Sequence, residues 1–167
     1  MRVYVPLTLP GLAAAHQAGE LGPAPLRAYA VTPALRDWYV SDDVEELEYA
    51  ALGRAAAASL RLLAADPAAA PRRVVVAVDV ADKAVSPLAG ADEEAGLGQV
   101  AVEGAVRLTA AGAVHADADD AGPEVAAAAA ALAAAEAGDE DARATVDGAE
   151  DHELLWFGVQ EIPNLIG

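Results

Sequence analysis

The segment that most constrains the fold is the stretch from residue 72 to 80, which reads Arg-Arg-Val-Val-Val-Ala-Val-Asp-Val. Its apolar residues are contiguous instead of alternating with polar ones. Contiguous apolar runs of this length are typical of a strand that is buried on both of its faces. The sequence therefore predicts a strand here that is covered on both sides.

A long helix is predicted over residues 42–65. Asp42, followed three positions later by Glu45, resembles a capping box, and acidic residues crowd the first turn, where the helix dipole favours them. Apolar residues then recur at the three-and-four spacing of a buried stripe. The stripe comprises Val44, Leu47, Ala51, Ala55, Ala58 and Leu62. We expect this helix to lie on one face of a sheet.

The remaining elements alternate between strands and helices. Strands are predicted at 2–6, 26–32, 99–109 and 153–159, and helices at 9–19 and 124–137. Three local signals accompany them: Thr8 as a helix N-cap, a strand end at Pro6, and a bulge at Gly104. The first and last strands are short and apolar, so we expect both at or beside the centre of the sheet.

This order of elements predicts an α+β fold in one domain spanning residues 1–167. Two strand–helix–strand units joined through adjacent strands are the plan of the ferredoxin-like split βαβ sandwich, here with an N-terminal insertion. A small three-layer α/β sandwich is the alternative. The acidic, glycine-containing stretch 138–151 is expected to be a mobile connection.

The charge of the chain is large and uneven. Residues 1–80 carry seven arginines against nine acidic residues, whereas residues 81–167 carry three basic against eighteen acidic residues, giving a formal net charge of −17 for the whole chain. Affinity for nucleic acids depends on neutralising phosphates with Lys and Arg. We therefore expect the chain to bind neither nucleic acid nor anionic membranes.

Cysteine is absent from the sequence. This excludes disulfides, thiolate nucleophiles and cysteine-ligated metals from the functions of the chain. No apolar stretch has the length of a signal peptide or of a membrane span. The expected location is the cytoplasm, and no cofactor is predicted.

Several segments resemble an uncharacterised family of actinobacterial proteins known only as a domain of unknown function. The segments are MRVYVPLTL, LRAYAVTPALRDWY, EELEYAAL, SLRLLA, RRVVVAVDV and LLWFGVQEIPNLI, which together represent nearly the whole chain. The resemblance implies a bacterial cytoplasmic protein. It assigns no catalytic residue, because the family has none assigned.

Motifs that carry chemistry are weak in this sequence. Gly96-Leu97-Gly98 is followed by a predicted strand, whereas a dinucleotide fingerprint requires a helix there. His115, Asp117 and Asp119 alternate along the chain in a way that could hold a divalent cation. The same residues also fit a solvated acidic loop before the helix at 124, and we expect no tight metal site.

The segment before the long helix is the best candidate for a binding surface. Arg36, Trp38 and Tyr39 bring a guanidinium and two aromatic rings next to Glu45 in the predicted first helical turn. Trp, Tyr and Arg dominate the energetic hot spots of protein interfaces. The alternative is that Trp38 and Tyr39 cover the core where the chain turns.

Two functions from different classes follow. The first is a non-enzymatic binding or regulatory module that acts through contacts with an unknown protein partner, a second copy of the chain included. The second is a small enzyme or ligand binder that uses carboxylates, with or without a divalent metal. The absence of a recognisable catalytic constellation favours the first.

Overall fold

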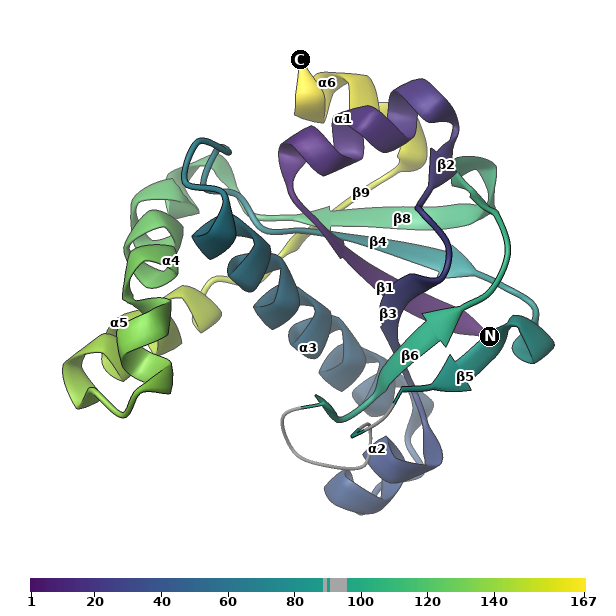
Figure 1. Ribbon diagram of the computed structural model, residues 1–167, viewed down its shortest axis with the longest axis horizontal. Helices are drawn as coiled ribbons and strands as arrows, with labels where there is room; N and C mark the ends of the chain where they lie inside the picture. Colours follow the sequence, from purple (N-terminus) through teal and green to yellow (C-terminus); the bar gives the residue numbers. More distant parts are fainter. Residues whose placement is uncertain (89, 91–95) are drawn as a thin grey trace.

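The chain folds around a seven-stranded sheet with helices on both faces (Figure 1). The computed structural model describes residues 1–88, 90 and 96–167. The strand order is β5-β6-β3-β1-β4-β8-β9, and neighbouring strands run antiparallel. The strands are β1 Arg2–Leu7, β3 Leu26–Ala30, β4 Val74–Asp79, β5 Val85–Pro87, β6 Gln99–Val102, β8 Ala111–Ala116 and β9 Leu155–Phe157.

A separate two-stranded sheet pairs β2 (Glu20–Leu21) with β7 (Val106–Arg107). The helices are α1 Leu9–Ala18, α2 Pro33–Tyr39, α3 Val44–Ala65, α4 Gly122–Glu136, α5 Glu140–Glu150 and α6 Ile162–Ile166. Single turns of 3-10 helix are η1 Asp82–Ala84, η3 Leu108–Ala110, η4 Asp119–Ala121 and η5 Val159–Glu161. Within the described residues, no helix combines the length and the apolar character that crossing a membrane requires.

The central strands separate two layers of core. In β4, Val74, Val76 and Val78 pack with Leu12 of α1 and with Ile162 at the start of α6. The alternate residues, Val75 and Ala77, pack with α3 on the opposite face. The predicted burial of this strand on both faces is therefore confirmed, and its cause is a helical layer on each side.

The α+β class is confirmed, but the ferredoxin-like arrangement is not. A ferredoxin-like sandwich places its helices on one face of the sheet, whereas here α1 and α6 lie on one face and α3 lies on the other (Figure 1). This layering corresponds to the three-layer alternative. The order of elements could not distinguish the two, because it does not reveal the face on which a helix packs.

Ser59 connects α3 to the two central strands, β1 and β4, by hydrogen bonds. Its side chain is fully buried, and Oγ donates a hydrogen bond to the Leu7 carbonyl oxygen at 2.6 Å. The same Oγ accepts a hydrogen bond from the Val74 backbone N–H at 3.0 Å. One hydroxyl thus joins the helix, β1 and β4.

Helix α3 begins later and faces the core differently than predicted. Its N-cap is Asp43 rather than Asp42. Leu47, Ala51 and Ala55 are buried as predicted, but Val44 and Leu62 are exposed. In the C-terminal half the buried positions shift to Ser59, Leu60 and Leu63, since α4 covers a second side of the helix there.

The stretch 138–151, expected to be a connection, contains helix α5. Asp139 caps this helix by accepting a hydrogen bond from the Ala142 N–H at 3.0 Å. Helices α4 and α5 form an antiparallel pair beside the C-terminal half of α3 (Figure 1). Val146 and Ala149 of α5 pack there with Leu60 and Leu63 of α3.

Local strand predictions were partly wrong. Strand β1 continues through Pro6, because β3 pairs with β1 only at Val3 and Tyr4 and leaves the proline without a ladder partner on that side. Gly104, with φ of 82°, separates β6 from β7 instead of forming a bulge. By contrast, Thr8 caps α1 as predicted, accepting a hydrogen bond from the Gly11 N–H at 3.2 Å.

The two terminal strands occupy different places in the sheet. Strand β1 is the middle strand, as expected, but β9 is an edge strand. Its residues Leu155 and Trp156 are exposed, so the expectation of a buried strand at 153–159 was wrong. The cause is that α3 and the α1–α6 pair cover the centre of the sheet and leave this edge open.

Candidate functional site

The predicted binding residues lie where α2 meets α3, and we name this surface the α2–α3 corner. It comprises Arg36, Trp38, Tyr39, Val40, Val44 and Glu45, all of them exposed. Helix α2 begins at an N-cap, Thr32, whose hydroxyl accepts a hydrogen bond from the Leu35 N–H at 3.2 Å. Leu35 is fully buried and anchors the helix, which leaves the following residues to project outward.

Trp38 is not a core residue. Its side chain is 50% exposed, and Tyr39 beside it is also exposed. The alternative that these aromatics cover the core is therefore not supported by their burial. The core of the sheet is built from Val, Leu and Ala instead, with Tyr4 and Tyr29 as its buried aromatic residues in the described chain.

The turn between the two helices holds an unusual backbone conformation. Val40 ends α2 in the left-handed region, with φ of 48° and ψ of 50°, and its N–H bonds to the Arg36 carbonyl oxygen. Branching at Cβ makes this conformation costly for valine. Because the Val40 side chain is 89% exposed, burial within the chain gives little to offset that cost.

The N-terminus of α3 is already occupied by side chains of the same segment. Asp43 Oδ1 accepts hydrogen bonds from the N–H groups of Glu45 and Glu46 at 3.0 and 3.3 Å. Ser41 Oγ donates to a carboxylate oxygen of Glu46 at 3.1 Å. With these donors satisfied and carboxylates crowded around them, the corner is suited to a cationic or neutral group and not to an anion.

The three residues considered for metal binding are separated by the fold. His115 lies in β8 opposite Trp156 of β9, where burial, followed by the nearby charge of Arg2, lowers its pKa. Asp117 is fully buried, whereas the Asp119 side chain is 97% exposed and pairs with Arg72 at 3.4 Å. The described residues contain no group of three or more His, Asp or Glu side chains arranged to hold a metal ion.

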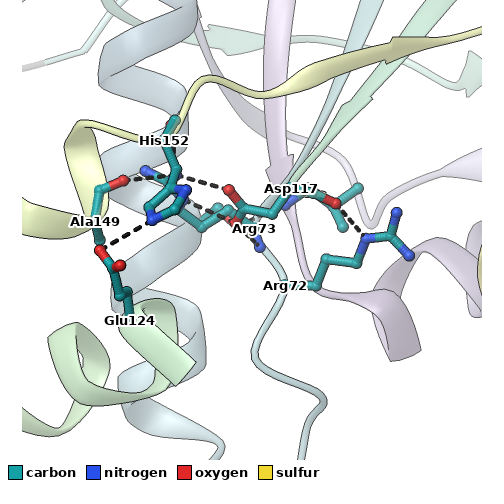
Figure 2. A network of polar contacts seen from close by, with 8 residues as sticks. Arg72, Arg73, Asp117, Glu124, Ala149 and His152 are labelled. Carbon is teal, nitrogen blue, oxygen red and sulfur yellow. Dashed lines mark hydrogen bonds and ion pairs between the residues drawn. The ribbon is translucent and has the colours of Figure 1, made fainter. Parts of the chain in front are cut away.

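Asp117 is instead half of a buried ion pair with Arg73, shown in Figure 2. Its two carboxylate oxygens accept hydrogen bonds from Arg73 Nη2 at 2.7 Å and from Arg73 Nε at 3.0 Å. Arg73 Nη2 also donates to the carbonyl oxygens of Ala149 and His152, both at 2.9 Å. This clamp joins the start of β4, the end of β8 and the C-terminal end of α5.

Two further contacts surround the clamp (Figure 2). Arg72 Nε donates to the Asp117 carbonyl oxygen at 2.7 Å, and His152 Nε2 lies 2.9 Å from a carboxylate oxygen of Glu124 in α4. Sequence reasoning missed Arg73 entirely. The sequence does contain a signal for it, since Arg73 directly precedes a strand that is buried on both faces. A guanidinium at such a position is buried as well, and a buried guanidinium requires a carboxylate partner.

The other motifs have structural roles. Gly98 adopts a φ of 81° in the turn before β6, where an added Cβ would lie 3.1 Å from the Ala30 carbonyl oxygen. A strand follows Gly96-Leu97-Gly98, so these glycines lack the helix that a dinucleotide site needs.

Comparisons with known proteins give a family and no function. Neither the curated proteins nor the solved structures contain a significant match to the chain. The model of one family, described as a family of unknown function (DUF6912), matches residues 1–166. The resemblance to a family of unknown function is thereby confirmed, and the chain belongs to the DUF6912 family.

Proposed function

We propose that the protein is a non-enzymatic binding module of the cytoplasm, which recognises a protein partner through the α2–α3 corner. The observation that carries this proposal is where the chain exposes its large apolar side chains. Four of them, Trp38, Tyr39, Val40 and Val44, belong to this corner. Clusters of exposed apolar and aromatic residues with a polar surround are typical of interaction sites.

The conformation of Val40 supports the same conclusion. Glycine or asparagine would adopt the left-handed conformation at lower cost, and the exposed valine side chain contributes little to the core. Stability of the free chain therefore does not favour valine at this position. A partner that covers Val40 would supply the burial that the free chain lacks.

Charge complementarity defines the partner. Five exposed carboxylates flank the apolar residues in the sequence, against one exposed cation, Arg36; they belong to Asp37, Asp42, Asp43, Glu45 and Glu46. A partner segment with aliphatic or aromatic residues flanked by Lys or Arg fits this surface. A homodimer through the corner is disfavoured, because both copies would bring the same carboxylates together. Nucleic acid is disfavoured for the same reason.

Selection from a randomised peptide library displayed on phage tests the proposal while the partner is still unidentified. Peptides selected on the immobilised protein should combine basic and apolar residues. Trp38→Ala should weaken their binding by about 2 kcal/mol or more, which corresponds to about 30-fold. Trp156→Ala is the matched control, because it removes the other tryptophan of the chain, which is also exposed but lies on the edge strand β9.

Two results would contradict the proposal. One is a set of selected peptides that are acidic or lack apolar residues. The other is a set whose affinity is unchanged by Trp38→Ala but lost with Trp156→Ala. Retention of a cooperative thermal transition by Trp38→Ala shows that a loss of affinity is not a loss of fold.

A further inference from the structure

A cleft of about 620 Å³ lies between α3 and the α4–α5 pair, away from the α2–α3 corner. Its volume falls within the range of about 300–1,000 Å³ that is usual for small-molecule sites. Three of the ten basic residues of the chain line it, namely Arg54, Arg61 and Arg143. Three carboxylates, those of Glu136, Asp147 and Glu150, line it as well, and Glu136 accepts a hydrogen bond from Arg61 Nε at 3.2 Å.

Two polar side chains at the cleft have no partner in the part of the chain that the structure describes. Tyr29 of β3 is only 6% exposed, yet its hydroxyl makes no hydrogen bond there. Arg143 of α5 makes neither an ion pair nor a hydrogen bond among the same residues. Polar groups at the wall of a cleft that lack a protein partner are available for hydrogen bonds to a bound ligand.

Opposite charges are spread along one face of α5. Arg143, Asp147 and Glu150 all line the cleft, at positions i, i+4 and i+7. A rise of about 1.5 Å per residue separates Arg143 from Glu150 by about 10 Å along the helix axis. The wall of the cleft is therefore positive at one end and negative at the other.

The negative end of this wall favours a cation. The pKa of Glu150 is raised, mainly by partial burial and secondly by the negative charge of Asp147. The positive charge of Arg73 lowers it in part. A positive group placed between Asp147 and Glu150 would relieve the repulsion between the two carboxylates. The positive end, with Arg143, is suited to a carboxylate.

The clamp described above fixes the position of this wall. Arg73 bonds to the Ala149 carbonyl oxygen, directly before Glu150 in the sequence, and is itself held by Asp117 (Figure 2). The C-terminal turn of α5 is thereby attached to β4 and β8. Polar groups held in place before a ligand arrives bind it with a smaller loss of conformational entropy.

We propose that this cleft binds a short peptide with free termini, of two to three residues, whose carboxylate lies at Arg143 and whose ammonium lies at Asp147 and Glu150. Extended peptides span at most about 3.3–3.6 Å per residue, so three residues match the charge separation of about 10 Å along α5. A single amino acid is too short to reach both ends. The hydroxyl of Tyr29 provides a further hydrogen bond to the ligand.

Titration calorimetry with trialanine and its blocked forms tests this inference. Trialanine should bind saturably, whereas N-acetyl-trialanine and trialanine amide, which each lack one terminal charge, should bind at least about tenfold more weakly, a difference of about 1.4 kcal/mol. Free alanine should also bind more weakly. Arg143→Gln, Glu150→Gln and Tyr29→Phe should each weaken trialanine binding.

Arg107→Gln is the matched control, because Arg107 is an exposed arginine on β7 that does not line the cleft. Its affinity for trialanine should equal that of the unchanged protein. Absence of saturable binding by both dialanine and trialanine overturns the inference. Equal binding of the blocked and free peptides, or binding unaffected by Arg143→Gln and Glu150→Gln in variants with unchanged thermal melting, also overturns it.

Discussion

Arg73 and Asp117 form a bidentate ion pair, in which Nη2 and Nε of the guanidinium lie 2.7 and 3.0 Å from the two carboxylate oxygens. Both side chains are almost entirely removed from solvent. Removal of one partner from such a pair leaves a buried charge without compensation. The pair therefore makes the stability of the fold sensitive to either residue.

Asp117→Ala should destabilise the protein by about 3–5 kcal/mol, the usual cost of breaking a buried ion pair from one side. Urea denaturation followed by circular dichroism measures this change. Asp119→Ala, two residues away and almost fully exposed, should change the free energy of unfolding by no more than about 0.5 kcal/mol. Equal effects of the two substitutions would show that the buried pair is not important for stability.

Asp43 and Asp42 should differ in their contribution to α3. Asp43→Ala removes the side chain that caps the helix, so it should lower the free energy of unfolding by about 1 kcal/mol. Asp42→Ala alters only an exposed neighbour and should have a smaller effect. The same denaturation experiment compares them, and a larger loss for Asp42→Ala would place the N-cap at the residue predicted from the sequence.

His115 should make the fold less stable as the pH falls. Burial and the charge of Arg2 lower the pKa of His115 in the folded state. In the unfolded chain the pKa of a histidine is about 6.5. Between pH 7.5 and 5.5 the unfolded state therefore takes up more protons, and acidification favours unfolding.

The melting temperature, measured across this pH range, tests the prediction. His115→Gln should reduce the decrease in melting temperature on acidification, and Arg2→Gln should reduce it in part by removing the second cause. Values above pH 5.5 keep most carboxylates ionised. A pH dependence that is the same in all three proteins would assign it to other groups.

The sequence predicted elements well where the signal is local. Thr8 caps α1 because the hydroxyl and the N–H that it accepts from are three residues apart. The burial of β4 was predictable from the contiguous valines of the strand itself. Helix α5 carried such a signal too, since Asp139 precedes Ala142, Val146 and Ala149 at helical spacing, but its acidic composition led to the expectation of a connection.

Features that depend on tertiary packing could not be predicted in this way. Strand β9 is last in the strand order and pairs with β8 alone among the described strands, and no property of residues 153–159 indicates how many neighbours the strand has. Likewise, Tyr29 and Arg143 are far apart in the sequence and meet at one cleft only because α5 is attached beside α3. The exposure of Trp38, in contrast, agrees with its short helix, which has room for one buried anchor, Leu35.

The placement of tryptophan determines how this protein can be observed by fluorescence. Both tryptophans of the chain, Trp38 and Trp156, are at least half exposed in the folded state. Their emission is therefore already close to that of indole in water, and denaturation will shift it little. A change in emission will instead report contact at α2 or at the β9 edge, which makes each single-tryptophan variant a sensor for one surface.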